Sequence, residues 1–296
     1  MRASTERSLR DAGLDPDAVA AVVRTALDED LGPQRLDVTS AATIPAEQVD
    51  SAELVARSPG VLAGLAVAEA VFDAASGGTV DFVAKASDGA RVARGDVLAT
   101  VTGPTRALLS AERTALNLLC RMSGVATHTR AWADALAGTG ATVLDTRKTT
   151  PGLRILEKYA VRAGGGTNKR MGLYDVAMIK DNHKVAAGGI GAAYRRVREA
   201  FPDVAVQVEV TTVAEAVEAV AAGATFLLCD NMTPDLLREV VAAVGGRAEL
   251  EATGGLTLAV AREYASTGVD YLSVGALTHS SPIVDIALDL RPRDGV

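Results

Sequence analysis

Basic side chains are concentrated in one part of this 296-residue sequence, between Asp145 and Lys184. The stretch holds nine Lys or Arg residues against four acidic ones, a net charge of +5 within a chain of net charge -7. Arginine offers a planar fork that matches a carboxylate or phosphate, and lysine offers a compact point charge. These cations therefore predict a small anionic ligand with two carboxylates, or with a carboxylate and a phosphate. We expect five of them to meet it: Arg147, Lys148, Lys169, Arg170 and Lys180.

Two carboxylates, Glu209 and Asp230, end two different apolar runs, VAVQVEV and TFLLCD. Hard divalent cations such as Mg²⁺ are usually held by one or two carboxylates together with substrate phosphates. The two residues therefore predict a site for Mg²⁺ and a diphosphate. Helix capping or ordinary ion pairing in the loops after these runs is the alternative that the spacing leaves open.

Two glycine motifs could bind phosphate: EATGGL at residues 251–256 and SVGALTHS at residues 273–280. Each follows an apolar run and precedes a helix-like segment, where free backbone N–H groups bind anions. His279, beside the second motif, is the histidine best placed for a functional role. His183 is expected to serve as a hydrogen-bonding group and His128 as a structural residue on a helix.

Lys180 has a second interpretation, as the Schiff-base lysine of an aldolase-type barrel. Such a lysine needs an apolar pocket, and the neighbouring Asp181 and cations fit that requirement poorly. Arg154, Lys158 and Arg162 recur at a spacing of four residues, which predicts one exposed face of a helix.

The composition argues against several classes of protein. Aromatic residues make up 3% of a chain that is 48% hydrophobic, which favours packed helices and strands over surfaces that stack bases. The acidic balance argues against general binding to nucleic acid or to anionic membranes. No run of 18 apolar residues occurs, so we expect a soluble, cytoplasmic protein. Cys120 and Cys229 lie in apolar runs without metal-ligand spacing and predict two reduced core thiols.

The first part of the chain predicts a small α+β layer. Residues 15–31 have helical spacing, with Asp15 as N-cap and Pro16 in the first turn. Short Val-rich runs separated by turn residues follow from about residue 37 to 103, with one helix near residues 66–75. A further helix is expected from Ser110 as its cap.

The second part predicts an α/β fold with a parallel sheet. Six short apolar runs alternate with helix-like segments, and repeated β-then-α units of this kind favour an α/β barrel, with an open doubly wound sheet as the alternative. In a barrel, the charged residues that end these strands would converge on one face. The six runs are TVLD, VAMIK, VAVQVEV, TFLLCD, AELEA and DYLSV.

Several of these motifs together resemble the quinolinate phosphoribosyltransferase family of NAD biosynthesis. The likeness is carried by DTRKT and IKDNH in order, with ERTALN, VQVEV, LLCDN, EATGGL and GVDYLSVGALTHS, and it runs from about residue 27 to the C-terminus. It implies an N-terminal α/β sandwich domain over residues 1–119, on which residues 280–296 pack back. It also implies an incomplete α/β barrel of the seven-stranded type over residues 120–279, and a homodimer with a shared site.

The resemblance also implies substrates and roles. The family joins quinolinate to phosphoribosyl diphosphate with Mg²⁺ and loss of CO₂, which gives nicotinate mononucleotide and diphosphate. By motif, Arg147, Arg170 and Lys180 would bind the quinolinate carboxylates, with Arg113 reaching in from the partner subunit. Lys148 would contact the phosphoribosyl group, and Glu209 and Asp230 would bind Mg²⁺ and ribose. The phosphate would be bound by Thr253, Gly254 and Gly275.

Two positions depart from the family pattern. Lys169 stands where the family has histidine, and a fixed cation can still meet a carboxylate although it lacks the geometry of imidazole. Thr253 replaces a serine and keeps its hydroxyl. The Lys169 change leaves open a paralogous transferase that acts on another pyridine carboxylate or base. A ligand-binding relative without catalysis is a third hypothesis.

Overall fold

The computed structural model describes residues 1–291 and divides into two compact units. Unit 1 comprises Met1–His128, Thr150–Gly165 and the residues from Ser280 onward, and unit 2 comprises Thr129–Thr149 and Gly166–His279. The predicted domain division at residues 119 and 120 stays a prediction, and its last residues, 292–296, lie outside the described part of the chain.

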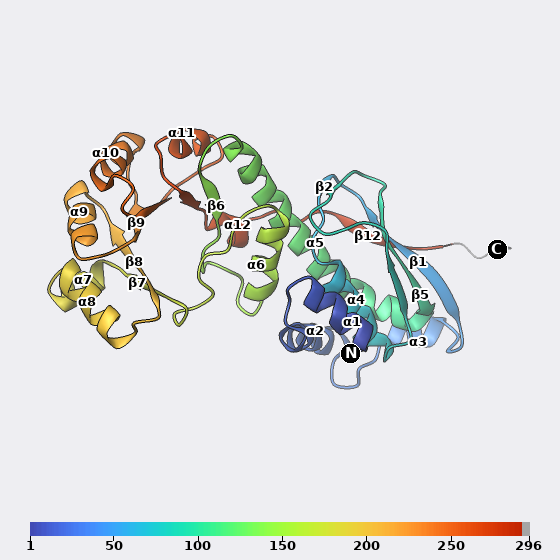
Figure 1. The fold of residues 1–296 in the computed structure, drawn as a ribbon. Helices are drawn as coiled ribbons and strands as arrows, with labels where there is room; N and C mark the ends of the chain where they lie inside the picture. Colours follow the sequence, from blue (N-terminus) through green and yellow to red (C-terminus); the bar gives the residue numbers. More distant parts are fainter. Residues whose placement is uncertain (292–296) are drawn as a thin grey trace. The chain divides into compact units, whose positions relative to one another are not determined.

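Unit 1 is an α/β unit built on an antiparallel sheet of order β12-β1-β5-β3 (Figure 1). Strand β12, near the end of the described chain, pairs along its whole length with β1. The elements of unit 1 are α1 (Ala3–Asp11), α2 (Pro16–Leu31), α3 (Val38–Thr43), β1 (Val49–Ala56), β2 (Gly60–Val61), α4 (Leu65–Ser76), β3 (Asp81–Ala84), β4 (Arg91–Val92), β5 (Val97–Pro104), α6 (Arg154–Ala163) and β12 (Ile286–Leu290), together with the part of α5 (Thr105–Leu136) up to His128.

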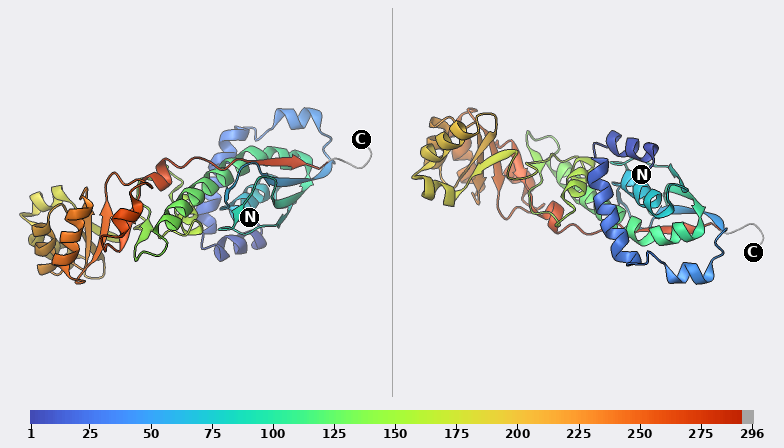
Figure 2. Two further views of the ribbon diagram at one scale, coloured as in Figure 1. Left: turned by 90° about the horizontal axis from the view of Figure 1, so that it is seen from above. Right: turned by 90° about the horizontal axis from the view of Figure 1, so that it is seen from below.

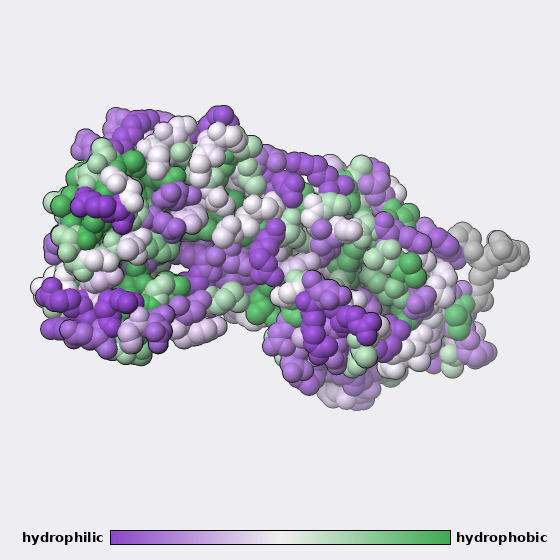
Figure 3. Space-filling view, viewed as in Figure 1, coloured by the Kyte–Doolittle hydropathy of each residue, from purple (hydrophilic) through white to green (hydrophobic). Residues whose placement is uncertain are grey.

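The helix signals at the start of the chain are confirmed. Asp15 accepts a hydrogen bond from the backbone N–H of Asp17, and α2 begins at Pro16. Helices α1 and α2 bury apolar side chains against α4 and leave a hydrophilic outer face (Figure 3). The expectation for Ser110 was wrong: α5 already begins at Thr105, so Ser110 lies inside a helical turn with no free backbone N–H to cap.

One charged residue in unit 1 is buried with a full set of partners. The carboxylate of Glu157 on α6, only 1% exposed, accepts from Arg121 Nη2 on α5 at 2.8 Å and from both the backbone N–H and the hydroxyl of Thr150. These bonds join α6 and the residues before it to α5. They therefore hold the start of segment 150–165 within unit 1.

We predict that Glu157→Ala destabilises the protein by about 3 kcal/mol, because it leaves the Arg121 guanidinium and the Thr150 N–H without their buried acceptor. Glu6→Ala is the matched control. It breaks an exposed pair with Arg10 on one helix, and we expect it to cost about 0.5 kcal/mol or less. Urea denaturation of both variants measures the difference, and equal free energies of unfolding would contradict the role of Glu157.

Unit 2 contains the six parallel strands that the sequence predicts, each from one of the six apolar runs. Helix α10 has Thr233 as its N-cap, and Gly245 closes it in the left-handed region. The elements are β6 (Thr142–Leu144), β7 (Val176–Ile179), α7 (Asp181–Ala187), α8 (Ile190–Ala200), β8 (Ala205–Val210), α9 (Val213–Ala221), β9 (Phe226–Asp230), α10 (Pro234–Val244), β10 (Glu249–Thr253), α11 (Ala261–Ala265), β11 (Tyr271–Ser273) and α12 (Ala276–His279).

The strand order β6-β11-β10-β9-β8-β7 excludes the doubly wound alternative for unit 2. Strands β7 to β11 are added one after another in a single direction, and the last of them pairs with the first strand, β6. A doubly wound sheet would instead reverse direction at a switch point. In the described residues β6 and β7 do not pair, although Thr167 forms an isolated bridge with Leu144 of β6. The α/β class is thus confirmed, as a barrel-like sheet open between β6 and β7.

Alternation along the strands decides which side chains reach the inside of this sheet. In β8, Val206, Val208 and Val210 pack into the apolar core under the helices, whereas Gln207 and Glu209 face the other side. Figure 2 shows from two directions that the yellow and orange helices of unit 2 lie outside its strands. Cys229 of β9 belongs to this outer core, and both cysteines are buried free thiols as predicted.

Candidate active site

A polar cavity of about 570 Å³ lies at the carboxyl ends of the strands of unit 2. Because parallel strands end at the same edge of the sheet, the residues that follow them meet there. Eleven of the twelve site residues predicted from the sequence line this cavity. They are Arg147, Lys148, Lys169, Arg170, Lys180, Glu209, Asp230, Thr253, Gly254, Gly275 and His279.

The twelfth predicted residue, Arg113, lies elsewhere. It is exposed on α5 in unit 1 and does not line the cavity within its own chain. Its expected role, as a residue contributed by a partner subunit, stays a prediction.

Two guanidinium groups face the cavity close to each other. Arg170 donates to the backbone carbonyl of Val176 at 3.0 Å, which holds its side chain along β7. Burial and the nearby charge of Arg147 both lower the pKa of Arg170. Like charges held together in this way favour the binding of an anion between them.

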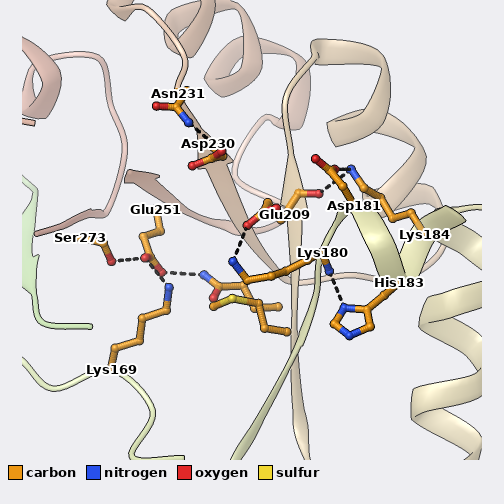
Figure 4. A network of polar contacts seen from close by, with 12 residues as sticks. Lys169, Lys180, Asp181, His183, Lys184, Glu209, Asp230, Asn231, Glu251 and Ser273 are labelled. Carbon is orange, nitrogen blue, oxygen red and sulfur yellow. Dashed lines mark hydrogen bonds and ion pairs between the residues drawn. The ribbon is translucent and has the colours of Figure 1, made fainter. Parts of the chain in front are cut away.

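The two carboxylates have different surroundings. Glu209 is mostly buried and forms an ion pair with Lys180 at 3.2 Å, whereas Asp230 accepts from the side-chain amide of Asn231 at 2.8 Å (Figure 4). Among the described residues, no group of three or more His, Cys, Asp or Glu side chains forms a protein cage for a metal. A pair of carboxylates in the wall of this cavity suits Mg²⁺, which shares its coordination with water and substrate phosphates.

Lys180 is held at the start of α7. Its backbone N–H donates to His183 Nδ1 at 3.0 Å, so His183 is a hydrogen-bonding residue as expected. The ammonium group of Lys180 is half-exposed and paired with Glu209, not enclosed in an apolar pocket. The Schiff-base interpretation is therefore disfavoured.

Lys184 on α7 contacts the backbone beside the Lys180–Glu209 pair. Its buried ammonium donates to the backbone carbonyl of Glu209 and pairs with Asp181 and Glu215 at 2.7 and 2.8 Å. The hydrogen bonds and charges of these two carboxylates raise the pKa of Lys184 against the effect of burial. Sequence reasoning assigned no role to Lys184, because its contact with β8 depends on the packing of α7.

Lys169 is anchored at both ends. Its backbone N–H donates to the buried carboxylate of Asp145, which also accepts from Asn168. Its ammonium donates to Glu251 at 2.5 Å on β10. Burial lowers the pKa of Lys169, and the charge of Glu251 partly opposes that effect. Sequence reasoning assigned no role to Glu251, which lies inside β10; its alternation with the apolar Leu250 and Ala252 was the available signal.

The two glycine motifs form another wall of the cavity. Gly254 has a φ of +100°, and a Cβ there would lie 2.2 Å from Oδ1 of Asn231. At Gly275 a Cβ would lie 2.9 Å from Cδ of Lys148 and 3.2 Å from Nε2 of His279. Glycine is therefore required at Gly254 by both conformation and space, whereas a Cβ at Gly275 would first displace the flexible side chain of Lys148; at both turns the absence of a side chain leaves the backbone open to a ligand.

We predict that Gly254→Ala lowers kcat/KM for a phosphorylated substrate by about tenfold or more, because the new methyl group displaces Asn231 beside Asp230. Gly255→Ala is the control: its φ is also positive, at +58°, but a Cβ there meets nothing within 4 Å. Steady-state kinetics of the two variants distinguishes the effect of the contact with Asn231 from that of backbone strain, and thermal unfolding checks their stability. Equal losses in both variants would count against the contact.

The remaining basic residues give one confirmation and one correction. His128 lies on α5, and its Nδ1 is 2.9 Å from Oγ of Ser281, in keeping with a structural role. The predicted exposed face of Arg154, Lys158 and Arg162 was wrong, because Lys158 is only 1% exposed. Helix α6 is buried over most of its surface, so a spacing of four residues did not place all three in solvent.

Known proteins resemble this chain over nearly its whole length. Residues 37–123 match the family model for the quinolinate phosphoribosyl transferase N-terminal domain, and residues 125–289 match the model for its C-terminal domain. A nicotinate-nucleotide pyrophosphorylase [carboxylating] of Mycobacterium leprae is 49% identical over 280 residues, covering 93% of this chain and 98% of the relative. A probable enzyme of the same name from Bacillus subtilis is 44% identical over 263 residues, covering 88% and 90%.

A solved structure shares the fold as well. The crystal structure of NadC from Streptococcus pyogenes superposes with a TM-score of 0.90 at 37% sequence identity and covers 95% of this chain and 99% of that one. The mixed α/β class expected from the sequence is therefore found in both the structure and its neighbours.

Proposed function

The chain belongs to the quinolinate phosphoribosyltransferase family, and we infer from this premise that it transfers the phosphoribosyl group of phosphoribosyl diphosphate to quinolinate with decarboxylation. The products are nicotinate mononucleotide, diphosphate and CO₂, a step of de novo NAD biosynthesis. The observation that carries this function is the grouping, in one cavity, of a guanidinium pair, two carboxylates and two glycine turns.

The cations divide the cavity between two anionic substrates. Arg147 and Arg170, which lie close together, suit the two adjacent carboxylates of quinolinate, with Lys180 beside them. The glycine turns at Gly254 and Gly275 present open backbone to the phosphate of the second substrate. Lys148 and His279, which both approach Gly275, lie next to that phosphate wall, and Thr253 adds a hydroxyl to it.

Glu209 and Asp230 would hold Mg²⁺ together with the diphosphate. When bound, the ion neutralises charge on the diphosphate and so makes it a better leaving group. The same two carboxylates would stabilise positive charge on the ribose as the bond to diphosphate breaks. Lys148 is expected to stabilise the negative charge of the departing group.

The reaction needs little proton transfer from the protein. The ring nitrogen of quinolinate attacks the ribose carbon and becomes a pyridinium. The bond to the adjacent carboxylate then breaks, its electron pair stays on the ring next to the positive nitrogen, and a proton is taken up at that carbon. The protein contributes by holding the dicarboxylate in orientation through its guanidinium groups.

A homodimer with a shared site is part of this proposal. Arg113 is exposed on α5 and is not among the residues that line the cavity of its own chain, as expected of a residue that serves a partner's site. In the described residues no helix is both long and apolar enough to span a bilayer. We place the enzyme in the cytoplasm, where its two buried free thiols would stay reduced.

The direct test is release of CO₂ from carboxyl-labelled quinolinate by the purified protein with phosphoribosyl diphosphate and Mg²⁺. We expect stoichiometric formation of nicotinate mononucleotide. A panel that includes nicotinate tests the paralogue hypothesis, since preference for the monocarboxylate would contradict a dicarboxylate site. Binding of quinolinate without turnover would instead indicate a non-catalytic relative and would overturn the proposal.

A further inference from the structure

A buried polar group lies behind the cavity wall, centred on Glu251 (Figure 4). This side chain is fully buried and accepts three hydrogen bonds from three different segments. The donors are Lys169 Nζ at 2.5 Å, Gln207 Nε2 at 2.6 Å, and the hydroxyl of Ser273. Both carboxyl oxygens of Glu251 accept hydrogen bonds, from Lys169 at one oxygen and from Gln207 at the other, and this arrangement suits an ion pair between Glu251 and Lys169.

Such a pair is costly unless its geometry is fixed. Taking both charges out of water is repaid only by close contact and by further hydrogen bonds to the carboxylate, which Gln207 and Ser273 supply here. The pair adds no net charge to the cavity. What Lys169 offers a ligand is therefore a donor held in one position, whereas the net attraction comes from Arg147 and Arg170.

We propose that Glu251 is a positioning residue for the quinolinate site: it holds the Lys169 ammonium at the cavity wall, where Lys169 donates to one substrate carboxylate and helps to select a dicarboxylate. The proposal rests on the proposed function. The proposal explains how a lysine can occupy this position. Glu251 offsets the charge of the Lys169 ammonium, so Lys169 offers the ligand a hydrogen-bond donor in a fixed position and adds no net charge.

The charged groups that face Lys169 come from four segments. Glu251 of β10 lies against its ammonium, Arg170 follows it in the same loop, and Lys180 stands at the end of β7. Asp145, after β6, binds its backbone N–H. Glu251 favours the protonated amine, whereas the two cations and burial disfavour it.

The sharpest test uses Lys169→His as a reporter, because imidazole titrates near pH 6.5 and can replace the amine as donor. In this variant we expect kcat/KM for quinolinate to fall as pH rises through the imidazole pKa. Adding Glu251→Gln should move that fall to lower pH by about one unit or more, since loss of an adjacent carboxylate favours neutral imidazole. Adding Glu249→Gln, an exposed position on the same strand, should leave it in place.

A second measurement separates positioning from a structural role. We expect Lys169→Met and Glu251→Gln each to raise the KM for quinolinate about tenfold, the double variant to be no worse than the worse single one, and the KM for phosphoribosyl diphosphate to stay within about twofold. If Glu251→Gln does not fold, Glu251→Asp should show the same selective rise in the quinolinate KM.

Three results would overturn the proposal: the same pH for the fall in kcat/KM with and without Glu251→Gln, additive effects of Lys169→Met and Glu251→Gln on the KM for quinolinate, or equal rises in the KM values for both substrates. The parent protein is assayed alongside for CO₂ release. Failure of the proposed function would then appear in the parent itself, whereas failure of this inference would appear only in the variants.

Discussion

Replacing Arg170 by alanine should raise the KM for quinolinate by about a hundredfold, with a much smaller change in the KM for phosphoribosyl diphosphate. Arg170 is partly buried beside Arg147, so its removal takes away a charge-assisted bond in a site sheltered from water. Truncating one member of such a pair typically costs 2–5 kcal/mol, or roughly thirtyfold to several thousandfold in affinity. Initial rates with each substrate varied in turn measure the effect.

Two further variants make this prediction specific. Lys169→His should retain activity at pH values below the imidazole pKa, where the protonated ring can donate both to Glu251 and to the ligand. Arg170→Lys should lie between the parent and Arg170→Ala, since it keeps a charge but loses the planar fork. Arg170 also donates to the carbonyl of Val176, so thermal unfolding is needed to show that β7 remains intact. A harmless Arg170→Ala would mean that the dicarboxylate site lies elsewhere.

The second large effect is expected at the carboxylates. Asp230→Asn should lower kcat by about 10²- to 10³-fold, the range seen when one group that stabilises transition-state charge is removed. Glu209→Gln should do the same and should also raise the concentration of Mg²⁺ needed for half-maximal rate. Rates measured across a Mg²⁺ series at saturating substrates test both variants.

The ion pair of Glu209 with Lys180 gives this experiment an internal check. Glu209→Gln releases Lys180 from its partner, so binding of quinolinate alone should stay as tight as in the parent or become tighter while turnover is lost. Asp235→Asn is the control, because that carboxylate is highly exposed and pairs with Arg238 nearby on α10. Loss of quinolinate binding in Glu209→Gln, or loss of rate in Asp235→Asn, would contradict the assignment.

Much of the site could be predicted because its residues sit at the ends of apolar runs. Strands of a parallel sheet end at one edge, so Arg147, Lys180, Glu209 and Asp230 had to converge once the six runs were identified as strands. The glycine turns were likewise visible as glycines that follow a strand, Gly254 and Gly255 in one motif and Gly275 in the other. The sequence could not tell whether Asp230 serves as a ligand or as a cap; the structure places it in the cavity wall.

The expectations that proved wrong concern surfaces and helix ends. Ser110 has the chemistry of a cap, but residues 105–109 continue the helix in front of it. Lys158 has the spacing of an exposed face, but α6 is enclosed on most sides. In both cases local pattern was overridden by what packs against the segment, which a single sequence does not record.

By itself, the sequence determined the six strands, the α/β class and most of the cavity residues, because strand periodicity and strand ends are local properties of the chain. Only the tertiary structure decided which charges are paired. Lys169 and Glu251 are 82 positions apart, and Lys180 and Glu209 are 29 apart, so their contacts depend on how the strands lie beside each other. Charge pairing falls steeply with distance and solvent exposure, and the same cation can therefore be a free ligand group or half of a buried ion pair.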